Sequence, residues 1–342
     1  MTLTNTKKRK LDKVPTAHDV AKIAEVSRWT VSRAFRNNAS ISKATYDRVM
    51  AAAKQLGYAP NLIASSLATS KTGLVALLID DFTNPHKLVM LQELTQALKS
   101  KGFDTLLLNT IDPEKTSEAL ASVRQRQVDA TVLVGSQFND DELLLAAESK
   151  AFKKLVIFAR RSEHPNTISV CVDDATAMNT IYRYIREKGY ANPLFLAGPQ
   201  TLTAHLKRKE TFLDLWLNAT GSLPASIDVG SYDPRLAYSA MLQYSETTSH
   251  DQFPDIIVCE NDALAIGATD ALRYELGMSI PEDIAIVGFD DVPLASSKAY
   301  SLTSYKQPIR EMSVAVAEFL SSEVDQKQLH AFTGEMVIRQ SG

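Results

Sequence analysis

Three residues near the N-terminus, Arg28, Trp29 and Arg33, have side chains that can read nucleic-acid bases. The planar guanidinium group of arginine can donate to O6 and N7 of guanine together, which discriminates against a wrong base by about 1–3 kcal/mol. Trp29 can offer apolar contact to a thymine methyl group. Hydroxyl groups nearby are suited to phosphate contacts, which position a protein without reading sequence. They belong to Ser27, Thr30 and Ser32.

Three short helices are predicted to hold these side chains. Thr16 and Asp19 have the spacing of a capping box, so a first helix begins after Thr16. Ser27 is a good N-cap for a second helix only two residues beyond the first, and a pair joined so tightly indicates a helix-turn-helix. A third helix runs from Ser42 as cap to Gly57 as stop.

In a helix-turn-helix the start of the second helix enters the major groove. Arg28 and Trp29 lie there, and Arg33 follows one turn on. The alternative for Trp29 is an aromatic ring packed in the core. We favour the base-proximal position because Trp29 lies beside Arg28, on the side away from the apolar residues Val31 and Phe35.

The charge distribution supports a polyanion as partner of this segment. The 342 residues have a net charge of −3, but residues 1–72 hold 13 Lys or Arg and 4 Asp or Glu, giving +9, and residues 73–342 hold the other 24 and 36, giving −12. A solvated basic tail is the alternative. The basic residues, however, extend well beyond the first ten positions into sequence with helical patterning.

Length and composition exclude several other classes. A chain of 342 residues with 45% hydrophobic residues predicts two or three globular units. No apolar run approaches the length of a membrane span, and the basic cluster at residues 7–13 is not followed by the apolar core of a secretory signal. Cys171 and Cys259 are too far apart in sequence to suggest a disulfide framework or a zinc site. We therefore predict a cytoplasmic protein without a membrane partner.

The motifs that would indicate an enzyme were not found. No Gly-rich phosphate loop ends in Gly-Lys-Ser/Thr, and no Gly-x-Ser-x-Gly elbow occurs. The six histidines are not at metal-binding spacing. The sequence therefore predicts a non-enzyme with no catalytic residues, no metal and no cofactor.

From residue 73 the pattern changes to apolar runs that alternate with amphipathic helices, as in a doubly wound α/β fold. The predicted strands fall into two groups divided around residues 160–163, which indicates two subdomains with a cleft between them. Ligands of such sheets bind beyond the carboxyl ends of the strands. The strands are predicted at 74–79, 105–108, 130–134, 155–158, 194–197, 256–259 and 284–287.

The N-terminal sequence resembles the lac/galactose repressor (LacI/GalR) family of bacterial transcriptional regulators. The resemblance is carried by Asp19-Val20-Ala21-Lys22-Ile23-Ala24, Thr30-Val31-Ser32-Arg33, Leu56-Gly57-Tyr58-Ala59-Pro60-Asn61 and Ala64-Ser65-Ser66-Leu67. It implies a hinge helix over Asn61–Ala68 that folds when two subunits dock on operator DNA. Leu67 would be the wedge in the minor groove, with the small residue Ala64 beside it. Thr16 and Asn61 are further expected contacts with the DNA backbone.

One residue departs from the family pattern in this segment. Glu25 stands in the turn between the first two helices, where the family usually has a small residue, often glycine. A side chain there strains a left-handed backbone conformation, and a carboxylate repels phosphate. We expect the helix-turn-helix domain, the DNA-binding head, to bind DNA slightly more weakly or at a different angle.

The rest of the chain resembles the effector domain of the same family. The motifs include Cys259-Glu260-Asn261-Asp262, Ile280-Pro281-Glu282-Asp283-Ile284 and Val287-Gly288-Phe289-Asp290-Asp291. They imply a periplasmic-binding-protein-like domain of two doubly wound subdomains joined by three crossovers. The expected organisation is a basic disordered arm over 1–15, a helix-turn-helix domain over 16–60, a hinge and linker over 61–72 and an effector and dimerisation domain over 73–342. Its subdomains are predicted as 73–160 with about 292–305, and 163–290 with about 308–342.

The resemblance also implies where an effector binds. Arg208, Asn261 and Asp290 match cleft residues of the family, and Asp262 is preferred as the cap of the following helix. Three further candidates are His86, Arg160 and Gln307. Where sugar-binding members often have an aspartate after the fourth strand, this chain has Ala159 and then Arg160, and His86 and Lys87 replace aromatic or apolar residues.

Fewer acceptors and more cations in the cleft suggest an effector with negative charge, such as a phosphorylated or acidic sugar. Lys87 could instead simply face solvent.

Taken with the head, these observations predict a repressor that acts as a homodimer on a pseudo-palindromic operator and responds to a small carbohydrate-related effector. The alternative is a ligand-binding α/β protein or a sugar-processing enzyme without specific DNA activity.

Overall fold

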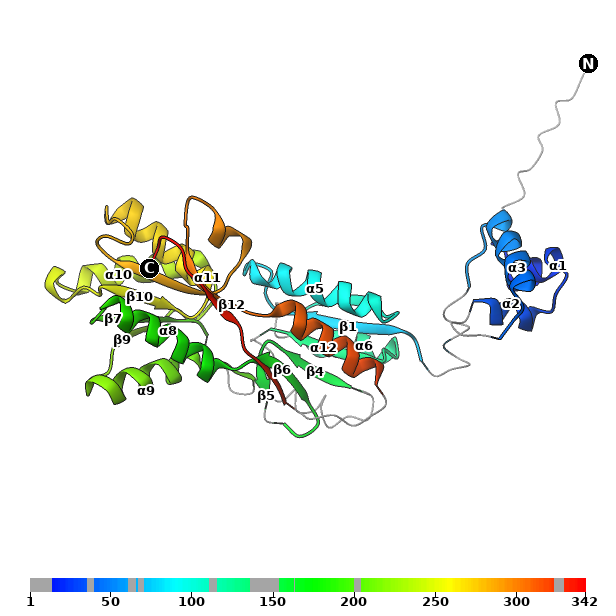
Figure 1. Ribbon diagram of the computed structural model, residues 1–342, viewed down its shortest axis with the longest axis horizontal. Helices are drawn as coiled ribbons and strands as arrows, with labels where there is room; N and C mark the ends of the chain where they lie inside the picture. The colour runs from blue at the N-terminus through cyan, green and yellow to red at the C-terminus, as the bar shows by residue number, and fades with distance from the viewer. Residues whose placement is uncertain are drawn as a thin grey trace, which may run out of the picture. The chain divides into compact units, whose positions relative to one another are not determined.

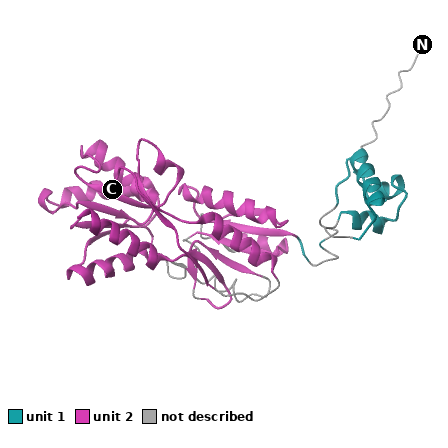
Figure 2. Cartoon of the chain, viewed as in Figure 1, with its two compact units in different colours: residues 1–72 teal, residues 73–342 magenta. Residues whose placement is uncertain are grey.

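The computed structural model consists of two compact units, residues 1–72 and 73–342 (Figure 2). The second begins at the residue from which strands and helices alternate in the sequence. The residues described are 14–35, 40–60, 66, 71–110, 116–135, 154–162, 164–199, 204–322 and 329–342.

The first unit contains the three predicted helices, α1 (Ala17–Ile23), α2 (Arg28–Ala34) and α3 (Lys43–Leu56). The predicted caps Thr16, Ser27 and Ser42 each accept a hydrogen bond from a backbone N–H of the first turn. The helices pack around Val20, Val31 and Val49, whose side chains are fully buried. Helix positions 28–33 are thereby fixed on a small apolar core.

Glu25 has a φ of +51°, in the left-handed region that side chains with a β-carbon rarely adopt. The expected conformation of the turn between α1 and α2 is therefore present. Most of the predicted hinge over Asn61–Ala68, including Ala64 and Leu67, lies outside the described residues, as does the arm over residues 1–13.

Among its described residues, the second unit contains two six-stranded sheets and one two-stranded sheet. The first has the order β13-β6-β4-β3-β1-β2 with every pair of neighbours parallel. Its strands are β1 (Leu74–Ile79), β2 (Asp104–Asn109), β3 (Ala130–Val134), β4 (Leu155–Phe158), β6 (Ile168–Val172) and β13 (Leu329–Phe332). Helices α5 (His86–Ser100) and α12 (Ile309–Ser321) cover one face, and α6 (Thr116–Gln125) covers the other (Figure 1). We call these elements the first lobe.

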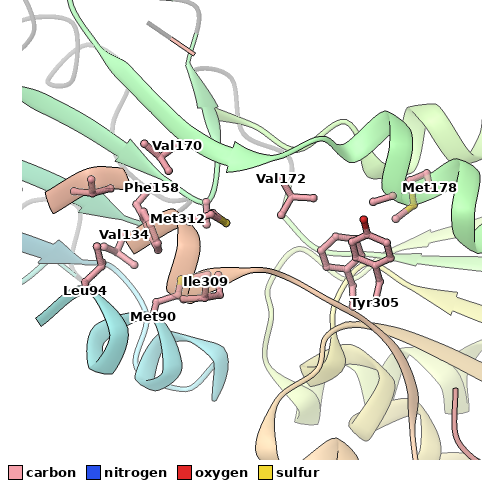
Figure 3. Packing of buried hydrophobic residues seen from close by; sticks show 14 of the residues in the cluster. Met90, Leu94, Val134, Phe158, Val170, Val172, Met178, Tyr305, Ile309 and Met312 are labelled. Atoms are coloured by element: carbon pink, nitrogen blue, oxygen red, sulfur yellow. The ribbon is translucent and has the colours of Figure 1, made fainter. Parts of the chain in front are cut away.

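Both faces of the inner strands of the first sheet are buried. Along β1, Leu77 packs on the side of α5 while its neighbour Leu78 packs on the side of α6. This arrangement explains why the strand reads as an unbroken apolar run rather than an alternating one. Figure 3 shows Met90, Leu94 and Met312 at the contact between α5 and α12.

The second lobe is built around the sheet β14-β12-β11-β10-β7-β9, in which only β14 is antiparallel to its neighbour. Its strands are β7 (Pro193–Ala197), β9 (Ala225–Asp228), β10 (Ile256–Cys259), β11 (Ala285–Asp290), β12 (Thr303–Lys306) and β14 (Glu335–Val337). The helices are α8 (Asp174–Lys188), α9 (Arg208–Thr220), α10 (Pro234–Thr247) and α11 (Asp262–Asp270), which continues as a π-helical turn over Ala271–Glu275. Helices α8 and α9 pack together, and so do α10 and α11.

The predicted segments of the subdomains were wrong in three places. Strand β6 belongs to the first sheet, so the chain leaves the first lobe after residue 172 rather than near 160–163. Residues 303–306 form β12 of the second sheet and not part of the first subdomain. Residues 308–342 are divided, since α12 and β13 belong to the first lobe and β14 to the second. The helix predicted over 140–149 lies outside the described residues.

The chain crosses between the lobes three times, after β6, after β12 and after β13, as the resemblance implied. The crossing segments lie close together. Asp173 N donates to Phe332 O at 2.8 Å, and Gly334 N donates to Tyr305 Oη at 2.9 Å. A β-carbon on Gly334 would lie 2.0 Å from Lys306 O, so only glycine fits at this crossing.

A buried carboxylate fixes the ends of the second sheet. Asp262 Oδ1 accepts from Ser304 Oγ at 2.7 Å and its Oδ2 accepts from Val292 N at 2.8 Å. Ser304 Oγ in turn accepts from Asp291 N at 3.0 Å. Burial, with a further effect of Asp290, raises the pKa of Asp262 well above its usual value. Helix α11 is thereby tied to the loop after β11 and to β12.

No helix of the described chain is long and apolar enough to cross a membrane. The same residues contain no group of three His, Cys, Asp or Glu side chains that could hold a metal ion. Cys171 and Cys259 are both buried and are not joined in a disulfide.

The Asp262→Asn variant should change how stability depends on pH. Because the folded pKa of Asp262 lies above the unfolded one, the wild-type protein loses stability from this group as pH rises above about 4. An amide keeps both hydrogen bonds, with its oxygen toward Val292 N and its nitrogen toward Ser304 Oγ, and does not ionise. Above pH 4, the free energy of unfolding of the variant should therefore rise relative to that of the wild type by up to about 1.4 kcal/mol per pH unit.

Urea unfolding at a series of pH values measures this difference. Asp251→Asn, which changes an exposed carboxylate, is the control. Parallel pH profiles for Asp262→Asn and the wild type would show that the Asp262 pKa is not raised by folding.

Candidate functional site

The exposed face of α2 carries the predicted base-reading residues. Trp29 is 65% exposed, whereas Val31 is fully buried in the head, so the ring is not a core side chain. The Arg33 guanidinium carbon lies 4.4 Å from the centroid of the Trp29 ring, a cation–π contact. Arg28 is exposed. The helix thus presents two guanidinium groups and one indole ring on the same stretch.

The predicted backbone-contacting residues also have local roles. Thr16 and Ser27 are helix caps, and Ser27 Oγ lies 2.9 Å from Thr30 Oγ1. Ser32 is exposed. Capping places these hydroxyls beside the N-termini of α1 and α2, where backbone N–H groups and the positive end of the helix dipole favour anions. Asn61, Ala64 and Leu67 lie outside the described residues, so nothing in the structure bears on their predicted roles.

A single cavity between the two lobes is lined by all six residues predicted to bind an effector: His86, Arg160, Arg208, Asn261, Asp290 and Gln307. They come from both lobes and from the crossover after β12. The cavity has a volume of about 30 Å³. The structure therefore brings together residues that span more than 200 positions of sequence.

Arg208, the first residue of α9, is 3% exposed. Its Nε donates to Asp174 Oδ1 at 3.1 Å and its Nη1 donates to Glu260 O at 2.9 Å. The guanidinium carbon lies 3.5 Å from the centroid of Phe289. Burial lowers the pKa of Arg208, but the carboxylates of Asp174 and Asp290 raise it, and the net shift is upward. The cation is therefore held rigidly in one orientation.

Asp290 ends β11, and its carboxylate is contacted from two parts of the fold. Its Oδ1 accepts from Gln307 Nε2 at 2.6 Å, and His86 Nδ1 lies 3.1 Å from the same oxygen. The contact with His86 joins the second lobe to the first. His86 Nε2 and Gln307 Oε1 are buried and have no hydrogen-bond partner among the described residues. Two polar atoms at the cleft are therefore unsatisfied.

Asn261, not Asp262, is the cap of α11. Its Oδ1 accepts from Leu264 N at 3.0 Å, whereas both oxygens of Asp262 are engaged by Ser304 and Val292. The preference for Asp262 as the cap was wrong, because Asp262 points into the sheet end instead. The cap uses the amide oxygen of Asn261, so its amide nitrogen is the group that remains for a ligand.

Lys87 also lines the cavity and does not face solvent. Its Nζ lies 3.3 Å from Asp80 Oδ1 and donates to Val134 O at 3.0 Å. Burial lowers the pKa of Lys87, Asp80 opposes this shift, and nearby Arg160 adds to it. The ammonium is thus a buried cation with another cation close by.

Sequence reasoning missed two other polar residues of the cavity, Asn84 and Tyr232. Asn84 directly precedes Pro85, and its Oδ1 accepts from His86 N at 2.9 Å. Tyr232 Oη donates to Glu260 Oε2 at 3.2 Å. Tyr232 lies in a loop after β9, and no local pattern in the sequence marks it.

The arrangement of these two sites agrees with what known proteins show. Residues 71–330 match the family described as periplasmic binding proteins and sugar binding domain of the LacI family. Residues 16–61 match the family described as bacterial regulatory proteins, lacI family.

Relatives match over nearly the full chain. The ribose operon repressor of Escherichia coli (strain K12) is 28% identical over 330 residues, covering 92% of this chain and 94% of that protein. The HTH-type transcriptional repressor PurR of Haemophilus influenzae (strain PittEE) is 26% identical over 337 residues, covering 95% and 98%.

Solved structures show the same fold. The Lac repressor bound to ONPG in the repressed state has a TM-score of 0.81 at 21% identity, covering 96% of this chain and 100% of that one. The Lac repressor dimer bound to operator and the anti-inducer ONPF has a TM-score of 0.80 at 22% identity, covering 96% and 99%. The predicted architecture, a helix-turn-helix head followed by an α/β periplasmic-binding-protein-like domain of two doubly wound lobes, is confirmed. The two family matches cover both of its units, and the chain belongs to the LacI family of bacterial regulatory proteins.

Proposed function

We propose that this protein is a transcriptional repressor that binds operator DNA sequence-specifically. A small carbohydrate-type effector raises or lowers its affinity for the operator. The observation that carries the proposal is the presence of two separate sites on one chain. One is the Arg28-Trp29-Arg33 face of α2, on which Arg28 and Trp29 are exposed and Arg33 is half-buried, and the other is the cleft lined by polar residues of both lobes.

In this proposal Arg28, Trp29 and Arg33 contact base edges in the major groove, and Arg33 is braced by its stacking on Trp29. Thr16, Ser27, Thr30, Ser32 and Asn61 contact the DNA backbone, and Ala64 and Leu67 enter the minor groove. Two heads on a homodimer read the two halves of a pseudo-palindromic operator. The +9 charge of residues 1–72 supplies the attraction to phosphate, so affinity falls steeply with salt.

The effector controls operator affinity through linkage. Arg208, Asn261, Asp290 and Gln307 belong to the second lobe or to a crossover, whereas His86 and Arg160 belong to the first. A ligand that contacts residues of both lobes favours one relative orientation of the lobes over another. Coupling of this kind between two binding sites is typically about 1–3 kcal/mol.

Selection of bound duplexes from a randomised pool with the full-length protein tests the proposal. A pseudo-palindromic motif should emerge, and its affinity should change in the presence of the effector. An unenriched pool at low salt would favour a ligand-binding protein without specific DNA activity.

The Arg33→Ala variant should lose base preference at one position of each half-site. Its guanidinium is the group poised to pair with guanine, so affinity for the selected motif should fall by about 1–3 kcal/mol while binding to unrelated DNA changes little. Competition binding against single-base variants of the motif measures this. Arg48→Ala, which removes an exposed charge on α3, is the control and should keep the preference. An unaltered preference in Arg33→Ala would refute the role of Arg33.

The Glu25→Gly variant should stabilise the head by about 0.5–1 kcal/mol, because glycine relieves the positive φ at some cost in unfolded-state entropy. Hydrogen exchange of the buried amides of α1 and α2 reports this change. Glu25→Gln removes the charge but keeps the β-carbon, so it should leave exchange unchanged. Equal protection in Glu25→Gly and Glu25→Gln would mean that the turn is not strained.

A further inference from the structure

The cavity between the lobes is unevenly charged at its surface. Three permanent cations line it, Lys87, Arg160 and Arg208, together with His86, whereas Asp290 is the single carboxylate among the described residues of the lining. Each of these side chains is more than nine-tenths buried. A buried charge needs a partner close by, so the positions of the remaining carboxylates decide whether the lining is already neutralised.

The other carboxylates lie behind the cations rather than in the cavity. Asp80 holds Lys87 at 3.3 Å and Asp174 holds Arg208 at 3.1 Å, and neither carboxylate lines the cavity. Glu260 accepts from Gly198 N and from Tyr232 Oη, again from outside the lining. Asp80 and Asp174 thus hold Lys87 and Arg208 from behind the lining, as supporting carboxylates do at anion sites.

Lys87 and Arg160 are the two permanent cations that the first lobe contributes to the lining. Both lie at the carboxyl ends of strands of the first sheet, since Lys87 donates to Val134 O at the end of β3 and Arg160 follows β4. Their mutual repulsion contributes to the lowered pKa of Lys87. Lys87 uses two of its three N–H donors on Asp80 and Val134. An anion placed here would meet the third donor and would lie between two like charges.

The second part of the lining is suited to hydroxyl groups. His86 Nε2 and Gln307 Oε1 are buried without a hydrogen-bond partner among the described residues, and both residues also contact Asp290. Gln307 Oε1 can only accept, so it needs a donor such as a hydroxyl. Asn261 offers its amide nitrogen beside it. A ligand that satisfies this part carries at least two hydroxyl groups.

We propose that the effector is a polyhydroxylated anion, a sugar phosphate or sugar acid, with its anionic group on Lys87 and Arg160 and its hydroxyls on His86, Gln307 and Asn261. This rests on the proposed function, in which the cleft is the effector site, and names the class of molecule that the cleft accepts. Phosphate and carboxylate share the chemistry that the two cations recognise, and the experiment below separates them.

Isothermal titration of the full-length protein, without DNA, compares matched ligands. The set is ribose with ribose 5-phosphate, glucose with glucose 6-phosphate and gluconate, and inorganic phosphate alone. At least one anionic member should bind about tenfold or more tightly than its neutral parent, as charge-assisted hydrogen bonds in a buried site require. Whether a phosphate or a carboxylate binds more tightly identifies the anionic group.

The variant for this test is the double substitution Asp80→Asn with Lys87→Gln. Removing both members of the buried pair avoids leaving Asp80 as an isolated buried charge, and a thermal melt checks that the protein folds. The preference for the anionic ligand should fall to about threefold or less. Arg160→Gln should reduce it independently. Lys99→Gln, on the exposed face of the same helix α5, should keep the full preference.

Several results would overturn the proposal. They are neutral sugars binding as tightly as their anionic counterparts, no binding by any anionic member, or an anion preference that survives the loss of Lys87 and Arg160. None of these results concerns DNA. A failure of the wider repressor function would appear instead as the absence of a selected operator motif, so the two failures are distinguishable.

Discussion

The carboxylate of Asp290 is held from two directions, and the geometry of the cleft depends on it. His86 reaches it from the first lobe, and Gln307 reaches it from the segment that crosses between the lobes. Asp290 itself has a φ of +118° and Asp291 a φ of +53°, conformations that are costly for residues other than glycine. Two hydrogen bonds hold this strained backbone in place. Arg339 Nη2 donates to Asp291 Oδ1 at 2.6 Å, and Ser304 Oγ accepts from Asp291 N. The backbone next to Asp290, the residue that joins the lobes, is thus held by β12 and by the segment after β14.

Much of the fold could be predicted from the sequence because its elements carry local signals. The helix caps Thr16, Ser27 and Ser42 marked the helices of the head, and the apolar run Leu74–Ile79 marked a strand buried on both faces. Strands β6 and β12 were missed because each contains hydroxyl residues that are buried. Ser169 in β6 bonds to Ser162, and Thr303 and Ser304 in β12 bond to Arg339 and Asp262. Buried hydroxyls with distant partners have no local signature, so the lobe boundaries drawn from the apolar runs alone were misplaced.

The cleft residues of the second lobe could be predicted from the sequence, whereas the burial of Lys87 in the first lobe could not. Arg208, Asn261 and Asp290 follow from motifs that resemble a known family, and the structure lines one cavity with all three. The orientation of Lys87 could not be read from helix periodicity, because a lysine at a helix start is most often solvated. Its burial depends on Asp80, seven residues earlier, and on the carbonyl of Val134, which lies on another strand. Tyr232 depends in the same way on Glu260, across the second sheet.

The separation of charge between the two units bears on how such a protein is controlled. Residues 73–342 carry −12, so DNA attracts only the +9 segment over residues 1–72. In the proposed function, the body therefore acts on operator affinity through the placement of two heads rather than through contacts of its own with phosphate. A ligand in the cleft alters the placement of the heads only if it binds one relative orientation of the lobes more tightly than another, however high its affinity. The contact between His86 and Asp290 spans the two lobes, so a ligand that inserts at this point must either keep or replace it. In the proposed function, the contact between His86 and Asp290 is therefore the point at which an effector differs from a molecule that only occupies the cleft.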